Sequence, residues 1–312
     1  MHGSPGDVSA GSPTNDAPDA SPPQTKGTNL VAEVVSGLAG RLRAAGVPTP
    51  EVDADLLAAH ALGWARASLR LRHAEPFSPE ARSRLDTLAE RRAGREPLQL
   101  IVGRVGFRYL DLVVRPGVFI PRPETEVLAG EAIARVPKGG VVVEPCTGTG
   151  AVACAVATEA SPRRVIATDV SPLAVALARE NAARTGASAV EVLPGDLLDP
   201  CPLSLRGAVD VLVSNPPYLT PAELATAEPE VRDWDPPEAL VSGLGGMEHT
   251  ARLCAAAPTW LRDGGWLLLE VDPSRAEATA CLAESAGLRH VQVLPDLTGR
   301  PRIVAGGEFS TA

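Results

Sequence analysis

The sequence predicts an α/β protein, in which a Rossmann-like domain with a seven-stranded, mainly parallel sheet follows a small N-terminal helical bundle. From residue 140 onward, short runs of β-branched residues alternate with helical segments, which is the pattern of a doubly wound sheet. Between residues 29 and 92, apolar residues instead recur at helical spacing. A chain of 312 residues, 45% of them hydrophobic, is long enough for both domains.

The first 27 residues are predicted to be a disordered tail. Residues 1–27 are rich in Gly, Ser, Pro and Asp and contain almost no large apolar side chain. Such a segment cannot bury enough apolar surface to offset the entropy lost on ordering. We therefore assign no catalytic role to it.

Residues 28–102 form the predicted helical domain. Apolar residues recur every four positions from Leu30 to Leu42, on one helix face. Residues 49–51 and 78–80 each combine an N-cap, a proline at the first helical position and an acid in the first turn. The domain is either a stabilising appendage or a surface that docks a macromolecular substrate, and its residues do not separate these two roles.

Residues 103–126 are predicted to be a β-hairpin linker, because apolar residues alternate there from Phe107 to Val114. The α/β domain then occupies residues 127–309. We expect its strands at 141–143, 165–168, 190–193, 211–214, 266–271, 291–294 and 303–305, and helices at 148–159 and 172–185.

The composition excludes several classes of protein. A net charge of −9 and a pI near 5.2 argue against broad nucleic-acid binding, which needs a basic surface. Five cysteines without a Cys-x-x-Cys pair support neither a disulfide framework nor a metal site, so a reducing cytoplasm is expected. No signal peptide and no apolar run long enough to span a bilayer are present. No pattern indicates an oligomeric state.

The turn at residues 144–150 has the pattern of a nucleotide-binding loop. Gly148 and Gly150 allow a tight turn and the close approach of a ligand to the start of a helix. Asp169 ends the next strand, where an acid can bond ribose hydroxyls; the alternative is a helix N-cap, a role that Ser171 could fill. Asp196 ends the third strand, where it could accept from an adenine amino group or serve only as a turn residue.

Asn215-Pro216-Pro217-Tyr218 follows the fourth strand and predicts a pocket for a planar NH2 group. Pro216 excludes Asn215 from the helical region, and the two prolines stiffen the loop. The Asn side chain and the Asn-Pro peptide each offer a carbonyl acceptor, and the Tyr ring offers a flat face. The alternative is an Asx-Pro turn on which the Tyr packs.

Two cofactor classes fit the loop at residues 144–150. A dinucleotide usually requires Gly-x-Gly-x-x-Gly, a pattern that tolerates Ala153 in the third place. Glu144 would repel a pyrophosphate but suits the ammonium and sulfonium groups of S-adenosylmethionine. This charge, together with Asn215-Pro216-Pro217-Tyr218, favours a methyltransferase over a dehydrogenase.

With these residues in place, the chain resembles the HemK/PrmC family, whose members methylate the glutamine of the Gly-Gly-Gln loop in peptide-chain release factors. The resemblance covers about residues 30–306. It rests on Leu-Arg-Ala-Ala-Gly at 42–46, Asp-Ala-Asp-Leu-Leu at 53–57, Arg-Arg-Ala-Gly-Arg-Glu-Pro-Leu at 91–98 and Pro-Gly-Val-Phe-Ile-Pro-Arg-Pro-Glu-Thr-Glu at 116–126. Asn-Pro-Pro-Tyr alone would also fit an adenine-N6 DNA methyltransferase, and the other segments shift the expected acceptor to glutamine.

The resemblance implies a class I methyltransferase fold, a release factor as partner and a role for each motif residue. Asn215 and the Pro216 carbonyl would accept hydrogen bonds from the glutamine amide. Pro217, Tyr218 and Phe107 would lie near the acceptor, and Arg122, Pro123, Glu124 and Thr125 would line the site from the linker. S-adenosylmethionine would be held by Glu144, Thr147, Gly148, Gly150, Asp169, Asp196, Leu197 and Asn215.

The chain departs from the family pattern at three places. Residues 144–150 read Glu-Pro-Cys-Thr-Gly-Thr-Gly in place of Asp-Leu-Gly-Thr-Gly-Ser-Gly, and Glu270-Val271-Asp272 replaces Glu-Ile-Gly. His249 and Thr250 stand where an aromatic residue is common. Because of these changes, an alternative substrate stays open. The same scaffold could methylate a nitrogen of a biosynthetic peptide or a small molecule. A non-catalytic binding module is a third alternative, against which the intact motifs argue.

Overall fold

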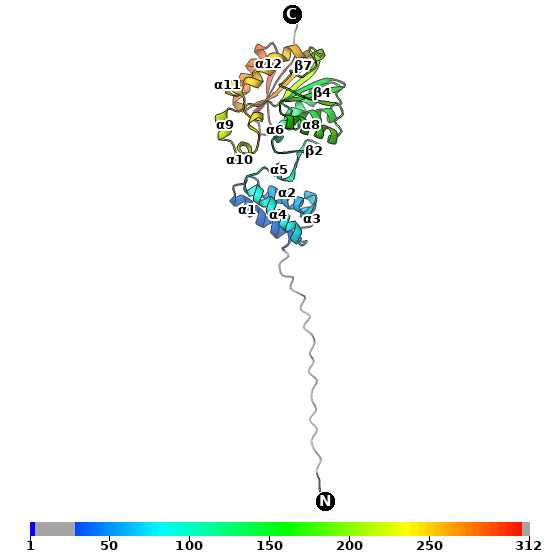
Figure 1. The fold of residues 1–312 in the computed structure, drawn as a ribbon, viewed down its shortest axis with the longest axis vertical. Coiled ribbons are helices and arrows are strands. Elements are labelled where there is room, and N and C mark those ends of the chain that lie inside the picture. The colour runs from blue at the N-terminus through cyan, green and yellow to red at the C-terminus, as the bar shows by residue number, and fades with distance from the viewer. Residues whose placement is uncertain (4–28, 308–312) are drawn as a thin grey trace.

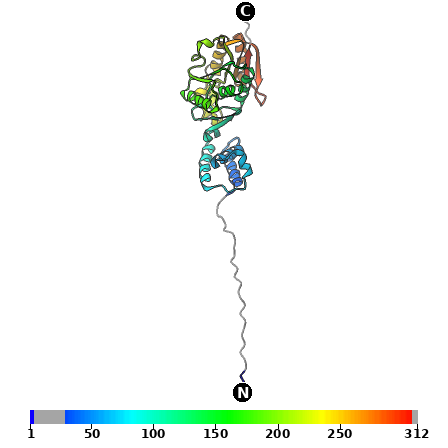
Figure 2. The same cartoon turned by 90° about the vertical axis from the view of Figure 1, so that its right-hand side faces the viewer.

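The computed structural model describes residues 1–3 and 29–307, and Figure 1 shows a helical bundle below a larger α/β unit. The side view in Figure 2 shows the same two parts joined by a narrow connection. The predicted disordered tail, residues 1–27, lies outside the described residues apart from its first three. Within the described residues, no helix is long and apolar enough to cross a membrane.

Two helices of the helical region begin at the predicted prolines, Pro50 and Pro79, but only one of the two predicted N-caps is confirmed. Thr49 makes no side-chain cap bond, because its hydroxyl donates to Asp53 Oδ1 instead. Ser78 Oγ accepts a hydrogen bond from Ala81 N at 3.2 Å and caps the helix that starts at the next residue. The expected apolar face starts one residue late, because Leu30 precedes its helix and is 39% exposed while Val31 is buried. The helices are α1 (Val31–Ala44), α2 (Pro50–Leu62), α3 (Arg66–Leu71), α4 (Pro79–Ala93) and α5 (Leu98–Val102).

A short hairpin connects the two parts of the chain. Strands β1 (Arg104–Phe107) and β2 (Leu110–Val113) are antiparallel. Residues 117–121 form no strand. Helix α6 (Pro123–Arg135) starts inside the predicted linker, because Pro123 occupies its first position and two acids follow in the first turn.

The α/β part contains the expected seven-stranded sheet, with strand order β5-β4-β3-β6-β7-β9-β8. The first five strands in this order are parallel, and β9 runs antiparallel to both of its neighbours. The strands are β3 (Val141–Pro145), β4 (Arg164–Asp169), β5 (Val190–Pro194), β6 (Val209–Ser214), β7 (Leu261–Glu270), β8 (Arg289–Pro295) and β9 (Pro301–Gly307).

Helices cover both faces of this sheet. One apolar cluster joins Leu128 and Val152 to Val142 of β3, and the other joins Leu253 to Ile166 and Leu267. The helices on the two faces include α6, α7 (Ala151–Glu159), α8 (Pro172–Thr185), α12 (Glu248–Trp260) and α13 (Ala276–Ser285). Between β6 and α12, the chain forms short elements that the sequence did not predict: α9 (Pro221–Ala225), α10 (Pro229–Arg232), a 3-10 turn (Pro237–Ala239) and α11 (Gly243–Gly246).

Candidate active site

A cavity opens at the carboxyl ends of β3, β4 and β6, where the strand order reverses direction. Crevices at this point of an open α/β sheet are the usual ligand sites. The cavity brings together most of the predicted site residues, which come from five separate segments. They are Thr125, Glu144, Thr147, Gly148, Asp169, Asp196, Leu197, Asn215, Pro216, Pro217 and Tyr218.

The two loop glycines have different roles. Gly148 lines the cavity with φ of 55°, and its N–H donates to Asp169 Oδ2 at 2.9 Å. Gly150, with φ of 78°, lies outside the cavity lining, and a Cβ there would stand 3.1 Å from the Cβ of Ala178. Gly150 therefore lets α7 approach α8, whereas Gly148 shapes the loop that faces a ligand.

Asp169 holds the loop together from the end of β4. Its Oδ1 accepts from Ser171 N at 2.9 Å, in addition to the bond that Oδ2 accepts from Gly148. The helix cap is Ser171, whose Oγ accepts from Ala174 N. Burial raises the pKa of Asp169, and its backbone hydrogen bonds oppose the shift. Each carboxylate oxygen can accept a second hydrogen bond, so a ribose contact is compatible with this geometry.

Glu144 is a buried carboxyl in the wall of the cavity. Its Oε2 accepts from Thr147 Oγ1 and from Ala153 N, both at 2.8 Å. Burial raises the pKa of Glu144 to about 8, so the group is mostly protonated at neutral pH. The negative charge expected from the sequence is therefore mostly absent at neutral pH. A cation bound in the cavity would lower the pKa of Glu144 and favour its ionised form.

Asp196 and Leu197 form the rim beyond β5. Asp196 Oδ2 accepts from Arg252 Nη2 of α12 at 2.7 Å, and the Asp196 side chain is 42% exposed. Leu197 is buried with φ of 43°, and its carbonyl accepts from Thr168 Oγ1 at 2.5 Å. Thr168 of β4 thus fixes the backbone at Leu197, while Asp196 is held only by an exposed ion pair with Arg252 of α12.

The predicted acceptor loop is held at both ends. Asn215 Nδ2 donates to Thr125 Oγ1 at 3.4 Å. At the other end, Tyr218 N donates to Leu240 O at 3.1 Å. Burial raises the pKa of the Tyr218 phenol to about 12, so this ring stays neutral. The Asn215 amide is therefore tethered through its nitrogen, beside a neutral aromatic ring.

Of the four linker residues predicted to line the site, only Thr125 does so. Pro123, Glu124 and Arg122 lie outside the cavity lining, and Arg122 contacts residues next to the lining. Arg122 pairs with the buried Asp235 and stacks over Phe119 at 5.0 Å. This ion pair holds the segment that carries Pro236, Ala239 and Leu240 into the cavity wall.

Phe107 requires a correction. It was expected near the acceptor pocket, but it is 1% exposed and belongs to the apolar cluster with Leu112 and Leu128. It does not line the cavity. The hairpin buries the Phe107 ring against α6 because that face of β1 closes the core, and the exposed ring of the hairpin is Tyr109 instead.

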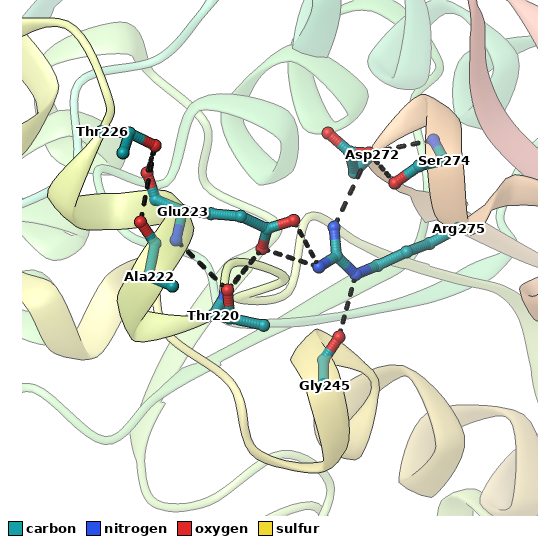
Figure 3. A network of polar contacts seen from close by, with 8 residues as sticks. All are labelled: Thr220, Ala222, Glu223, Thr226, Gly245, Asp272, Ser274 and Arg275. Atoms are coloured by element: carbon teal, nitrogen blue, oxygen red, sulfur yellow. Dashed lines mark hydrogen bonds and ion pairs between the residues drawn. The ribbon is translucent and has the colours of Figure 1, made fainter.

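A polar network that the sequence did not reveal supports the chain beyond Tyr218. Arg275 donates to Glu223 at 2.7 Å and, through Nε, to Gly245 O at 3.1 Å (Figure 3). It thereby joins α9, α11 and the turn after β7. Asp272, the departure from the family's glycine, accepts from Ser274 N at 2.9 Å in the same network. The partners are far apart in sequence, and no local pattern pairs them.

Comparisons with known proteins agree with this architecture. Residues 33–103 match the family model described as PrmC N-terminal domain, and residues 112–228 match that of the Methyltransferase small domain. The fold and the site thus define a methyltransferase with an N-terminal helical region. The chain belongs to the release factor glutamine methyltransferase family, as its relatives show.

The release factor glutamine methyltransferase of Mycolicibacterium smegmatis is 47% identical over 84% of this chain and 92% of its own length. That of Deinococcus radiodurans is 44% identical over 88% of this chain and 99% of its own length. Among solved structures, a protein-(glutamine-N5) methyltransferase (release factor-specific) from Alicyclobacillus acidocaldarius is 25% identical, with a TM-score of 0.36 over 61% of this chain and 95% of that chain.

Proposed function

We propose that the protein transfers the methyl group of S-adenosylmethionine to the side-chain amide nitrogen (N5) of the glutamine in the Gly-Gly-Gln motif of a peptide-chain release factor. One observation carries the proposal: the Asn215 amide and the loop of Glu144 and Gly148 line the same cavity. The acceptor is taken from the relatives, which are named release factor glutamine methyltransferases and match this chain over nearly their whole length. Because release factors act in translation termination, we expect the reaction in the cytoplasm.

The cofactor half would use the loop after β3 and the ends of β4 and β5. S-adenosylmethionine supplies an electrophilic methyl group on a sulfonium. Glu144 suits the cationic part, Asp169 the ribose hydroxyls and Asp196 the adenine amino group. Asp196 could accept this group while it keeps its bond to Arg252, because that bond uses Oδ2 and each carboxylate oxygen can accept two hydrogen bonds.

The acceptor half would activate a poor nucleophile. The lone pair of an amide nitrogen is delocalised into its carbonyl. Asn215 Oδ1 and the Pro216 carbonyl would each accept one N–H of the glutamine, which raises electron density at nitrogen and aligns it with the methyl group. As the N–C bond forms, the S–C bond breaks, and the surplus proton leaves the nitrogen for solvent. The neutral Tyr218 ring would cover the site.

The test is methylation of a defined peptide. The protein is incubated with S-adenosylmethionine and a full-length release factor, which is then digested and weighed by mass spectrometry. The expected result is one added methyl group on the Gly-Gly-Gln peptide, absent when that glutamine is replaced by glutamate. An unmodified peptide under conditions where the cofactor binds would refute the release factor as acceptor. It would turn attention to the alternative, N-methylation of a biosynthetic peptide or small molecule.

A further inference from the structure

His249 is a half-buried side chain of the cavity wall for which the reaction described above has no role. It is the second residue of α12 and lines the cavity. It is also one of the departures from the family pattern. An imidazole carries two ring nitrogens, so this position can hydrogen-bond to a ligand as well as pack against it.

Ser242 holds the imidazole from one side. The distance between Ser242 Oγ and His249 Nδ1 is 2.7 Å, and the backbone N–H of His249 donates to the same Oγ at 3.3 Å. Ser242 is 3% exposed, and its own N–H donates to Leu219 O at 2.9 Å. The ring is therefore tied to the chain that directly follows Tyr218.

The Ser242 hydroxyl decides which ring nitrogen carries the proton. Its oxygen already accepts from the His249 backbone, and its single proton has no acceptor other than Nδ1 among the hydrogen bonds of residues 29–307. A neutral imidazole that accepts at Nδ1 carries its proton on Nε2. This Nε2 has no partner within the part of the chain that the structure describes. The ring thus offers the cavity one hydrogen-bond donor.

The face of α12 that carries His249 meets the rim after β5. Residues three and four positions further along a helix lie on the same face. Three positions on, Arg252 donates to Asp196 Oδ2 at 2.7 Å, and four positions on, Leu253 packs in the same apolar cluster as Leu197. His249 and Asp196 also line the same cavity. The imidazole donor and the carboxylate therefore come from neighbouring segments.

A donor near a carboxylate is complementary to adenine. The 6-amino group of adenine donates hydrogen bonds, and the ring nitrogens on either side of it, N1 and N7, accept them. A hypoxanthine ring, which carries a carbonyl in place of the amino group, would set an acceptor against the carboxylate. The contact of α12 with the rim after β5 favours the adenine over the acceptor glutamine as the ligand of His249.

We propose that His249 is a specificity-determining residue for the cofactor. Its Nε2–H donates to a ring nitrogen of the adenine of S-adenosylmethionine, while Asp196 accepts from the 6-amino group. Ser242 is a positioning residue, because it fixes the proton on Nε2. The inference rests on the proposed function, which supplies the cofactor, and goes beyond it by assigning a contact with the base to a side chain of α12.

The first experiment measures ligand binding to the native protein by calorimetry. The ligands are S-adenosylhomocysteine and its two analogues in which a carbon atom replaces adenine N1 or N7. We expect one analogue to bind ~10-fold more weakly than S-adenosylhomocysteine, the scale of one lost hydrogen bond, and the other to bind about as tightly. If both analogues bind as tightly as S-adenosylhomocysteine, no ring nitrogen is recognised and the inference is overturned.

The second experiment repeats the titrations with His249→Phe, which keeps a flat ring but removes the donor. This variant should bind S-adenosylhomocysteine ~10-fold more weakly than the native protein does and should no longer distinguish the weaker analogue. A preference as large in His249→Phe as in the native protein would contradict the assignment. So would an unchanged affinity for S-adenosylhomocysteine with a raised KM for the release factor, because Nε2 would then face the acceptor.

Ser242→Ala tests the positioning role from outside the cavity lining. Affinity for S-adenosylhomocysteine should fall by less than in His249→Phe, because the proton is no longer fixed on Nε2 but can still occupy it. With His249→Phe as the background, Ser242→Ala should cost little further. An equal loss in both backgrounds would show that Ser242 acts on the fold and not through His249.

These titrations need no release factor, so the two proposals can fail separately. If the release factor is not methylated but His249→Phe abolishes the preference for the ring nitrogen, the proposed acceptor fails and the inference stands. If the release factor is methylated and the native protein does not distinguish the analogues, the inference fails alone.

Discussion

The two halves of the cavity are built in different ways. In the cofactor half, Glu144 bonds to residues three and nine positions away, and Asp169 reaches back to Gly148. In the acceptor half, Arg122 pairs with Asp235 across 113 positions of the sequence. The loop after β3 and Asp169 are thus held by near neighbours in the sequence, whereas Asp196 on the same side pairs with Arg252, 56 positions away.

The acceptor half is also tied to the helical region. Arg92 and Arg95, near the end of α4, both donate to Oε1 of Glu230 in α10. The distance is 2.9 Å from Arg92 Nη2 and 2.8 Å from Arg95 Nε. Arg92 is itself buried and pairs with Asp53 of α2. Because α10 precedes the Pro236–Leu240 part of the wall, these ion pairs connect the helical region to that side of the cavity. If the proposed roles hold, we expect cofactor binding to depend mainly on local structure and acceptor binding on more distant parts of the chain.

The largest effect is expected for Asn215→Ala. The rate of methyl transfer should fall by ~10²-fold or more, because an oriented acceptor is lost from the reacting nitrogen. Affinity for S-adenosylhomocysteine should fall far less, since Glu144 and Asp169 keep their own bonds. Single-turnover assays and calorimetry measure the two quantities. A parallel fall in both would mean that the halves are not separate.

Asp169→Ala should have the opposite profile. It leaves the N–H groups of Gly148 and Ser171 without their acceptor and removes the proposed ribose contact. We expect cofactor affinity to fall by ~10- to 100-fold, the cost of one or two lost polar contacts. The matched control is Asp199→Ala, an exposed acid a few residues beyond the rim, which should be silent. Equal losses would assign the effect to net charge.

Glu230→Ala tests the long-range support of the acceptor half. It removes an acceptor shared by Arg92 and Arg95, and chemical denaturation should show a stability loss of about 1–3 kcal/mol. Glu191→Ala breaks an ion pair with Arg164 whose side chains are 47% and 35% exposed, and should cost less than about 1 kcal/mol. If both variants lose equally little, the ion pairs to α10 do not hold the two parts together.

The last prediction concerns the pH dependence of cofactor binding. The raised pKa of Glu144, about 8, means that the carboxyl binds a proton below that pH and must release it to face a cation. Affinity for S-adenosylmethionine should therefore rise with pH, by at most ~10-fold per pH unit, and level off near pH 8. Glu144→Gln should flatten the curve. S-adenosylhomocysteine, which has no sulfonium, should depend less on pH, and an identical slope for both ligands would contradict the assignment.

The sequence predicted that the loop after β3 and the acids at the ends of β4 and β5 meet at one cavity, because the signals for this placement are local. Glycines between a strand and a helix, and acids at strand ends, are short-range patterns. Even there, packing decided one role: Gly150 serves the approach of α7 to α8, which depends on Ala178 in another helix. The protonation of Glu144 also depends on burial, which a motif does not reveal.

The acceptor half was predicted only where a motif marks it. Asn215 and Tyr218 line the cavity and Phe107 does not, because alternation in a short hairpin does not say which face meets the core. The elements between β6 and α12 were missed since they are short and rich in Pro and Gly. The motif at residues 270–272 does not show that the Glu270 carboxyl is buried, because its burial depends on packing against distant parts of the chain.

A small apolar cluster between the helical region and the α/β part limits how such proteins can evolve. Leu100 of α5 and Ile120 of the linker form a small buried cluster, against which Trp234 beside the cavity wall packs. Removal of the helical region would leave Ile120 and Trp234 facing water. Recombination could therefore not exchange one part for that of an unrelated protein without new residues on the other side of the seam.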